Sequence, residues 1–237
     1  MLVARGLAET RARAQALLLA GRVYTGERRL EKPGMQVDRA LPLTVRGTDH
    51  PWVSRGGIKL NHALAHFEID PSGLTALDIG ASTGGFTDVL CQRGARRVYA
   101  VDVGYGQLDV RLRDDARVTV LERTNARYLS REQVPEPIDL IVCDASFIGL
   151  RTILPAPLAL AADGARLVAL IKPQFEAGRG RVGKGGIVRD PAVHADVCET
   201  IRDWLTAEGW PAIGLTESPI KGRDGNTEFL IAARRTP

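Results

Sequence analysis

The stretch that decides the fold is Leu77-Asp78-Ile79-Gly80-Ala81-Ser82-Thr83-Gly84-Gly85-Phe86. It reads as an apolar strand that ends in an acid, a loop of small residues, and the start of a helix. At such a corner, backbone N–H groups can approach a ligand closely. A second apolar run ends in Asp102, and an acid at the tip of the second strand commonly holds ribose hydroxyls. The pattern predicts a pocket for a nucleoside-bearing cofactor.

The spacing of the glycines favours one cofactor over another. The dinucleotide fingerprint is G-x-G-x-x-G, whereas here three residues separate Gly80 from Gly84. Asp78, just before the loop, would also repel a pyrophosphate. S-adenosylmethionine has an ammonium, a sulfonium and a ribose but no phosphate, so we favour it. The alternatives are a dinucleotide, or a glycine turn that only closes the corner between strand and helix.

Length and composition describe an ordinary globular chain without export signals. The 237 residues are 44% hydrophobic, and no apolar run is long enough for a membrane span. The N-terminus lacks the ordered blocks of a signal peptide. Three widely spaced cysteines suit buried thiols in a reducing compartment, so we expect a cytoplasmic protein. The four histidines show no metal spacing with the cysteines, and we predict no metal site.

Positive charge is concentrated at the N-terminal end. Residues 1–60 carry eleven Lys/Arg and five Asp/Glu, a net +6, while the remainder carries twenty-one and twenty-three, a net −2. A basic segment joined to a near-neutral body suggests a polyanion-binding unit attached to an enzyme. The alternative is a basic face that is only solvated.

Turn signals divide the chain into two units. Residues 1–46 predict a short helix followed by small β hairpins, a unit too small for a large core of its own. Residues 47–58 are polar and turn-rich and suit a linker. Residues 59–237 form the body, in which strands are expected at 74–79, 97–102, 117–122, 138–144, 165–172, 211–217 and 227–233. The helices expected between them are 59–67, 85–93, 107–114, 151–161 and 191–208.

The body predicts an α/β fold. Apolar runs such as residues 140–143 and 167–171 lack polar alternation, which is typical of strands buried on both faces. Strands that alternate with helices form a doubly wound, mostly parallel sheet, here with seven strands and of the Rossmann-like type. Ligands bind such sheets beyond the carboxyl ends of the strands.

Four charged residues fall on this predicted ligand edge. Asp144 and Lys172 follow apolar strands, Glu228 precedes the last strand, and Lys59 lies before the first strand of the body. Charges at the ends of buried strands are costly unless they are paired, and two lysines and two carboxylates can neutralise one another. Each alone could be a solvated strand end. The basic, glycine-rich loop 178–186, with Lys184, has room for a phosphate backbone, or is a plain surface loop.

With these motifs the chain closely resembles the TlyA, or haemolysin A, family of S-adenosylmethionine-dependent ribosomal RNA 2′-O-methyltransferases. The shared motifs lie at 53–60, 77–88, 101–108, 122–127, 172–176 and 225–229. The body also resembles the FtsJ group of ribose methyltransferases, whose Lys-Asp-Lys-Glu tetrad maps onto Lys59, Asp144, Lys172 and Glu228. The resemblance implies a cofactor site made of Asp78, Gly80, Ala81, Ser82, Thr83, Gly84, Gly85, Phe86, Asp102, Val103, Glu122 and Asn125.

The N-terminal unit resembles an RNA-binding domain of the ribosomal-protein (alpha-L) type, through residues 5–15 and 21–23. Family members usually begin with a full first helix, which here appears truncated, and a Tyr24-Thr25-Gly26 turn replaces the common Asn before the glycine. The resemblance implies ribosomal RNA, or a ribosomal subunit, as the partner. The sequence leaves the oligomeric state open, and we favour a monomer. The candidate RNA-binding residues are Arg5, Arg11, Arg13, Arg22, Arg55 and Lys184.

The implied reaction is methyl transfer to a ribose 2′-hydroxyl, of cytidine, in ribosomal RNA. Most of the rate should come from holding oxygen, methyl carbon and sulfur in line. Lys172 is the residue expected nearest the hydroxyl, as base or as hydrogen-bonding orienter, with the carboxylates orienting the lysines. The rival functions are a non-catalytic RNA-binding ribosome factor, which has no need of a tetrad, and a membrane-active haemolysin, for which no amphipathic or spanning segment is visible.

Overall fold

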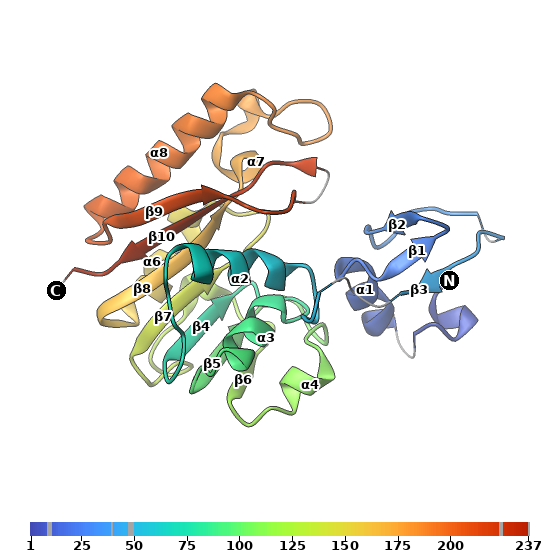
Figure 1. The fold of residues 1–237 in the computed structure, drawn as a ribbon, viewed down its shortest axis with the longest axis horizontal. Coiled ribbons are helices and arrows are strands. Elements are labelled where there is room, and N and C mark those ends of the chain that lie inside the picture. Colours follow the sequence, from blue (N-terminus) through green and yellow to red (C-terminus); the bar gives the residue numbers. More distant parts are fainter. Residues whose placement is uncertain (9–10, 39, 47–49, 223–224, 237) are drawn as a thin grey trace.

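The chain folds into a small N-terminal unit and a larger body built on one sheet (Figure 1). The computed structural model describes residues 1–8, 11–38, 40–46, 50–222 and 225–236. Residues 47–49 of the expected linker therefore lie outside the described part of the chain.

The N-terminal unit is a short helix packed on a three-stranded antiparallel sheet. Its core is Leu2, Ala8, Leu17, Val23 and Leu30. The sheet order is β2-β1-β3, and the third strand is only two residues long. The elements are η1 (Val3–Arg5), α1 (Arg11–Leu19), β1 (Val23–Thr25), β2 (Arg28–Leu30) and β3 (Thr44–Val45).

The body contains the predicted seven-stranded, mostly parallel sheet. Its order is β6-β5-β4-β7-β8-β10-β9. The first five strands in this order are parallel, and β10 runs antiparallel between β8 and β9. The strands are β4 (Thr75–Ile79), β5 (Arg97–Val101), β6 (Val118–Leu121), β7 (Ile138–Cys143), β8 (Ala161–Ile171), β9 (Ala212–Glu217) and β10 (Phe229–Arg234).

Helices cover both faces of this sheet, which is why its central strands read as unbroken apolar runs. Leu140 and Val142 of β7 face the helices α2 and α3, while Ile141 and Cys143 face α5, α6 and α8. The helices are α2 (Gly56–His66), α3 (Gly85–Gln92), α4 (Val110–Arg113), α5 (Leu150–Ile153), α6 (Pro155–Ala159), α7 (Pro173–Glu176) and α8 (Pro191–Ala207), with short 3-10 turns η2 (Ala126–Tyr128) and η3 (Arg179–Arg181).

Three helices differ from the expected bounds. The expected helix 151–161 is two short helices, because Pro155 begins the second of them. The helix expected at 107–114 covers only Val110–Arg113, since Asp109 caps it by accepting a hydrogen bond from the N–H of Arg111. Helix α2 begins at Gly56, three residues early, since Val53 is buried and anchored to Asp88 and draws the preceding segment onto the body.

Burial raises the pKa of the Cys143 thiol to about 12 and those of Cys91 and Cys198 to about 11. All three thiols are free and buried, so they act as small apolar core residues. Within the described residues, no His, Cys, Asp and Glu side chains cluster as metal ligands would, and no helix has the length and apolarity to cross a membrane.

Candidate active site

The glycine corner lies where β4 meets α3, at the carboxyl edge of the sheet. Gly80 has a φ of +82°, and a Cβ there would lie 3.0 Å from the Cα of Ala145. Only glycine accepts that backbone angle and that close approach without strain. Ser82 also has a positive φ, of +49°. The corner therefore brings its backbone against the loop that follows β7.

Asp102 holds the corner in place from the end of β5. Its Oδ2 accepts a hydrogen bond of 2.8 Å from the N–H of Ser82, and its Oδ1 accepts one of 2.7 Å from the N–H of Gly104. Each carboxylate oxygen has two acceptor positions, so each retains one for a ligand hydroxyl. Asp102 lines a cavity of about 610 Å³ beside the corner.

Asp78 lies beneath the corner and is completely buried. Its Oδ2 accepts a 2.6 Å hydrogen bond from the hydroxyl of Thr87, while its Oδ1 has no hydrogen-bond partner. Burial raises the pKa of Asp78 to about 7. A carboxylate buried at this position favours positive charge in the neighbouring cavity, through its field and without direct contact.

Not every predicted cofactor residue reaches a cavity. Glu122 instead accepts hydrogen bonds from the N–H of Gly106 and the guanidinium of Arg113, at 2.9 and 2.6 Å. Asp78, Gly84 and Glu122 line neither of the two cavities at this edge. The predicted residues that do are Gly80, Ala81, Ser82, Thr83, Gly85, Phe86, Asp102, Val103 and Asn125.

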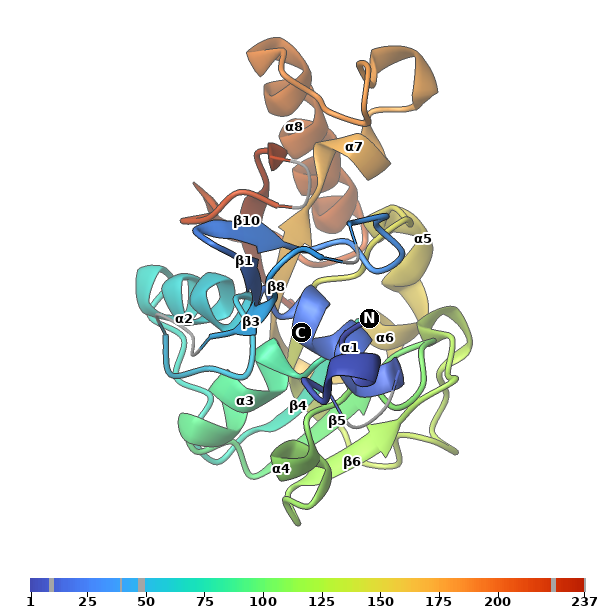
Figure 2. The same ribbon diagram turned by 90° about the vertical axis from the view of Figure 1, so that its right-hand side faces the viewer.

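The N-terminal unit completes the cavity of about 610 Å³ beside the corner, which we call the cofactor-side cavity. Gln15 and Leu19 of α1 line it together with Pro33, and Figure 2 shows α1 in front of the carboxyl ends of β4 and β5. Sequence reasoning missed these residues because nothing local marks a helix that covers a distant pocket. It also missed Ser146 and Phe147, although they directly follow Asp144.

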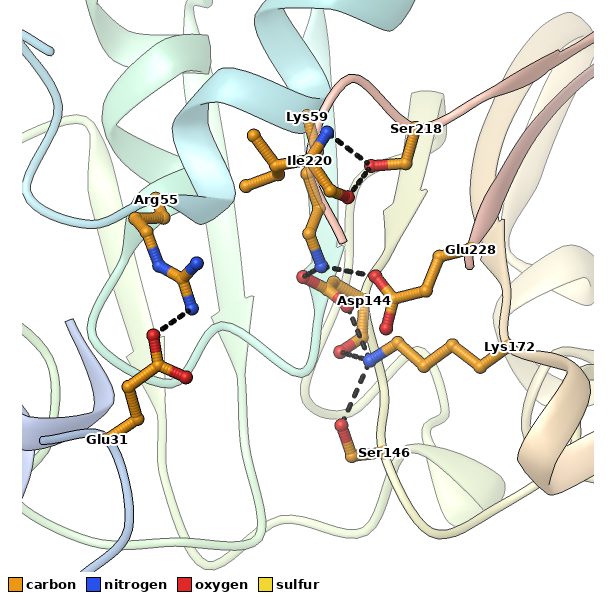
Figure 3. Close-up of polar contacts among 9 residues, drawn as sticks. All are labelled: Glu31, Arg55, Lys59, Asp144, Ser146, Lys172, Ser218, Ile220 and Glu228. Carbon is orange, nitrogen blue, oxygen red and sulfur yellow. Dashed lines mark hydrogen bonds and ion pairs between the residues drawn. The ribbon is translucent and has the colours of Figure 1, made fainter. Parts of the chain in front are cut away.

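The four tetrad residues meet in one cluster, although Lys59 and Glu228 are 169 residues apart (Figure 3). The Nζ of Lys59 lies 2.6 Å from Oε2 of Glu228 and 3.6 Å from Oδ2 of Asp144. The Nζ of Lys172 lies 2.6 Å from Oδ1 of Asp144. Asp144 therefore bridges the two lysines, and Glu228 pairs with Lys59.

Charge pairing compensates for burial in this cluster. Burial alone would raise the pKa of Asp144, but the ammonium groups of Lys172 and Lys59 more than offset burial and lower it. Burial would lower the pKa of Lys59, but the carboxylates of Asp144 and Glu228 raise it. Removing one partner would leave an uncompensated buried charge.

A second cavity, of about 320 Å³, lies over the tetrad and adjoins the cofactor-side cavity. Ser146 and Phe147 line both cavities. The hydroxyl of Ser146 lies 2.9 Å from Nζ of Lys172, whose remaining neighbour is the carbonyl of Asp144 at 3.2 Å. The Phe147 ring is 78% exposed and contacts Phe175. Because the tetrad lies where the two cavities join, it can align a group bound in one cavity with a group bound in the other.

The candidate RNA-binding residues lie in different surroundings. Arg55 lines the tetrad cavity, and Arg13 pairs with Asp109 of the body at 3.5 Å. Arg22 is half-buried, whereas Arg5, Arg11 and Lys184 are exposed.

Residues 52–235 match the FtsJ-like methyltransferase family. The chain belongs to this family. It is 47% identical to the 16S/23S rRNA (cytidine-2′-O)-methyltransferase TlyA of Mycobacterium tuberculosis, over 98% of this chain and 87% of that one. It is 39% identical to Hemolysin A of Brachyspira hyodysenteriae, over 95% and 94% of the two chains.

Solved structures agree with this family assignment. A Streptococcus thermophilus protein is 44% identical, with a TM-score of 0.79 over 99% of this chain and 86% of that one. The N-methyltransferase NodS of Bradyrhizobium japonicum, solved with S-adenosyl-L-homocysteine, is 20% identical with a TM-score of 0.55, over 80% of this chain and 90% of that one. At that identity the likeness concerns the fold alone, which is the Rossmann-like methyltransferase fold.

Proposed function

We propose that this protein transfers the methyl group of S-adenosylmethionine to a ribose 2′-hydroxyl of cytidine in ribosomal RNA. The observation that carries the proposal is the Lys-Asp-Lys-Glu tetrad at the junction of two cavities, one of them edged by Asp102. A cluster of paired lysines and carboxylates has no use in a protein that only binds RNA.

The residues present fit S-adenosylmethionine, which supplies an electrophilic methyl group on a sulfonium when bound. Asp102 has acceptor positions for ribose hydroxyls, and the field of the buried Asp78 carboxylate favours a cationic end near the corner. The N–H groups of the glycine corner and the side chains of Val103 and Asn125 would line the rest of the site. Glu122 would act indirectly, by holding the loop at Gly106.

The tetrad would hold the hydroxyl in line with the methyl carbon. Lys172 lines the tetrad cavity and contacts two residues that line both cavities, since the carboxylate and carbonyl of Asp144 and the hydroxyl of Ser146 surround its Nζ. We assign it the role of orienting the 2′-oxygen through a charge-assisted hydrogen bond. Lys59 and Glu228 then fix Asp144, which fixes Lys172. The bound cofactor would supply the methyl group, and Lys172 would hold the 2′-oxygen while its proton passes to solvent.

An exposed ring that lines the tetrad cavity suits a base that is turned out of its stack. Phe147 is exposed beside Phe175, and unstacked RNA bases commonly stack on aromatic side chains.

We further propose that residues 1–46 are an RNA-binding unit, 47–58 a linker and 59–237 the catalytic domain of a cytoplasmic monomer.

Single-turnover methylation of ribosomal RNA with labelled S-adenosylmethionine tests this function. Lys172→Ala should reduce methyl transfer at least about 100-fold while cofactor and RNA affinities stay unchanged, because the interaction is made mainly in the transition state. Arg202→Ala, on the exposed side of α8, is the surface control. Methylation by the Lys172→Ala enzyme at a near wild-type rate would exclude a catalytic role for this lysine. Absence of 2′-O-methylation by the wild-type protein would exclude the function.

A further inference from the structure

Two arginines from different units pair with one carboxylate beside the tetrad cavity. The Nε of Arg29, on β2, lies 2.6 Å from Oε1 of Glu31, and Nη2 of Arg55, at the start of α2, lies 3.1 Å from the same oxygen. Figure 3 shows Glu31 reaching from the N-terminal unit toward Arg55. The contact therefore joins the two units at the entrance to the site.

This cluster has more positive than negative charge. Two guanidinium groups share one carboxylate, which leaves a net charge of about +1. Burial lowers the pKa of Arg55, although Glu31 opposes that effect, and the buried Nε–H of Arg55 has no hydrogen-bond acceptor. The Arg55 side chain is still 23% exposed, so an arginine with incomplete charge compensation is placed to bind a further anionic oxygen through its accessible N–H groups.

The backbone at Gly21 makes the arrangement possible. Gly21 has a φ of +69°, and a Cβ there would lie 3.2 Å from Cδ of Arg29 and 3.2 Å from Nε of Arg55. A larger residue would strain the turn and shift both arginine side chains by a few tenths of an ångström. The turn after α1 therefore permits the two arginines to lie side by side.

The position of the cluster indicates which anion it would meet. Arg55 and Lys59 line the same cavity, one turn apart on α2. An RNA strand that places a ribose at the tetrad must place its neighbouring phosphates within a few ångströms of that cavity. Arginine binds a phosphodiester through two parallel N–H···O bonds, as it binds a carboxylate.

We propose that Arg29 and Arg55 form a binding site for an RNA phosphate at the border of the two units, and that Glu31 occupies this site until RNA displaces it. The inference rests on the proposed function in taking RNA as the ligand. It assigns Glu31 the role of an internal competitor, which limits RNA affinity and leaves the arginines paired in the free protein.

Binding of ribosomal RNA to Glu31→Gln, measured over a range of KCl concentrations, tests the site. The variant should bind about tenfold more tightly at low salt, because no carboxylate has to be displaced from the arginines, and the gain should shrink as KCl screens the charges. A phosphate contact carries no sequence information, so unrelated RNA should show the same gain.

Glu27→Gln is the matched control, since Glu27 pairs with Arg46 at 3.0 Å on the exposed β1–β2 turn. Like Glu31→Gln, this substitution removes one negative charge from the N-terminal unit. Arg29→Met in the Glu31→Gln background should cancel the gain. Equal affinity of the two glutamine variants, or weaker binding by Glu31→Gln, would overturn the proposal. Glu31 would then serve only to hold the two units together.

Failure of this site and failure of the proposed function give different results. If the wild-type protein methylates ribosomal RNA but Glu31→Gln does not bind it more tightly, only the phosphate site is wrong. If Glu31→Gln binds RNA more tightly but the wild-type protein transfers no methyl group, the phosphate site stands and the enzymatic function fails.

Discussion

Replacing Asp78 by asparagine should stabilise the protein above pH 7 and weaken cofactor binding. Burial raises the pKa of Asp78 from 3.8 to about 7. Below pH 3.8 both folded and unfolded chains hold the proton, so there is no cost. Between the two values only the folded chain holds it, and stability falls by about 1.4 kcal/mol for each pH unit. Above pH 7 the ionised carboxylate therefore lowers the free energy of unfolding by about 4 kcal/mol.

Asparagine removes this cost but introduces another. Its oxygen can accept the hydrogen bond from Thr87, and its amino group then takes the position of Oδ1, which has no hydrogen-bond partner. A buried unsatisfied donor costs about 1–3 kcal/mol. The net effect should be a gain of about 1–3 kcal/mol above pH 7 and a loss of about 1–3 kcal/mol near pH 4.

Urea denaturation at these two pH values measures the change of sign, and calorimetric titration with S-adenosylmethionine measures the affinity. Above pH 7, where Asp78 is ionised, the affinity should fall by about 1–2 kcal/mol, because the region beside the cavity loses a negative charge. Asp203→Asn, on the exposed surface of α8, controls for a change of net charge. An equal loss of stability at both pH values would refute the account of burial, and unchanged cofactor affinity would remove Asp78 from the site.

The remaining predictions concern the cofactor, the RNA and the orientation of Lys172. Asp102→Ala should weaken S-adenosylmethionine binding by about 1.5–3 kcal/mol in calorimetric titration; an unchanged dissociation constant in a folded variant would exclude Asp102. Neutralising Arg11 and Arg13 together should weaken RNA binding and flatten its salt dependence without changing cofactor affinity, and an unmoved salt slope would contradict this. Ser146→Ala removes one of the hydrogen bonds to Lys172, so single-turnover methylation should slow about fivefold; no change would show that Ser146 does not hold the lysine.

The sequence alone predicted the parts of the fold that depend on local chemistry. Buried parallel strands need continuous apolar runs, and β7 and β8 were recognisable for that reason. The corner around Gly80 was recognisable because small residues between a strand and a helix have few other uses. Charged residues at strand ends identified the ligand edge, and the resemblance to known ribose methyltransferases selected the tetrad among them.

Only the tertiary structure decided how these residues meet. Asp144 pairs with both lysines while Glu228 pairs with Lys59, and Glu122 turns from the cofactor cavity toward Arg113. The contacts of α1 with the cofactor cavity and of Glu31 with Arg55 cross between the two units. The periodicity of apolar residues indicates which face of an element is buried. It does not indicate which distant element packs against that face. Pairings over such separations therefore emerge only when the chain is folded.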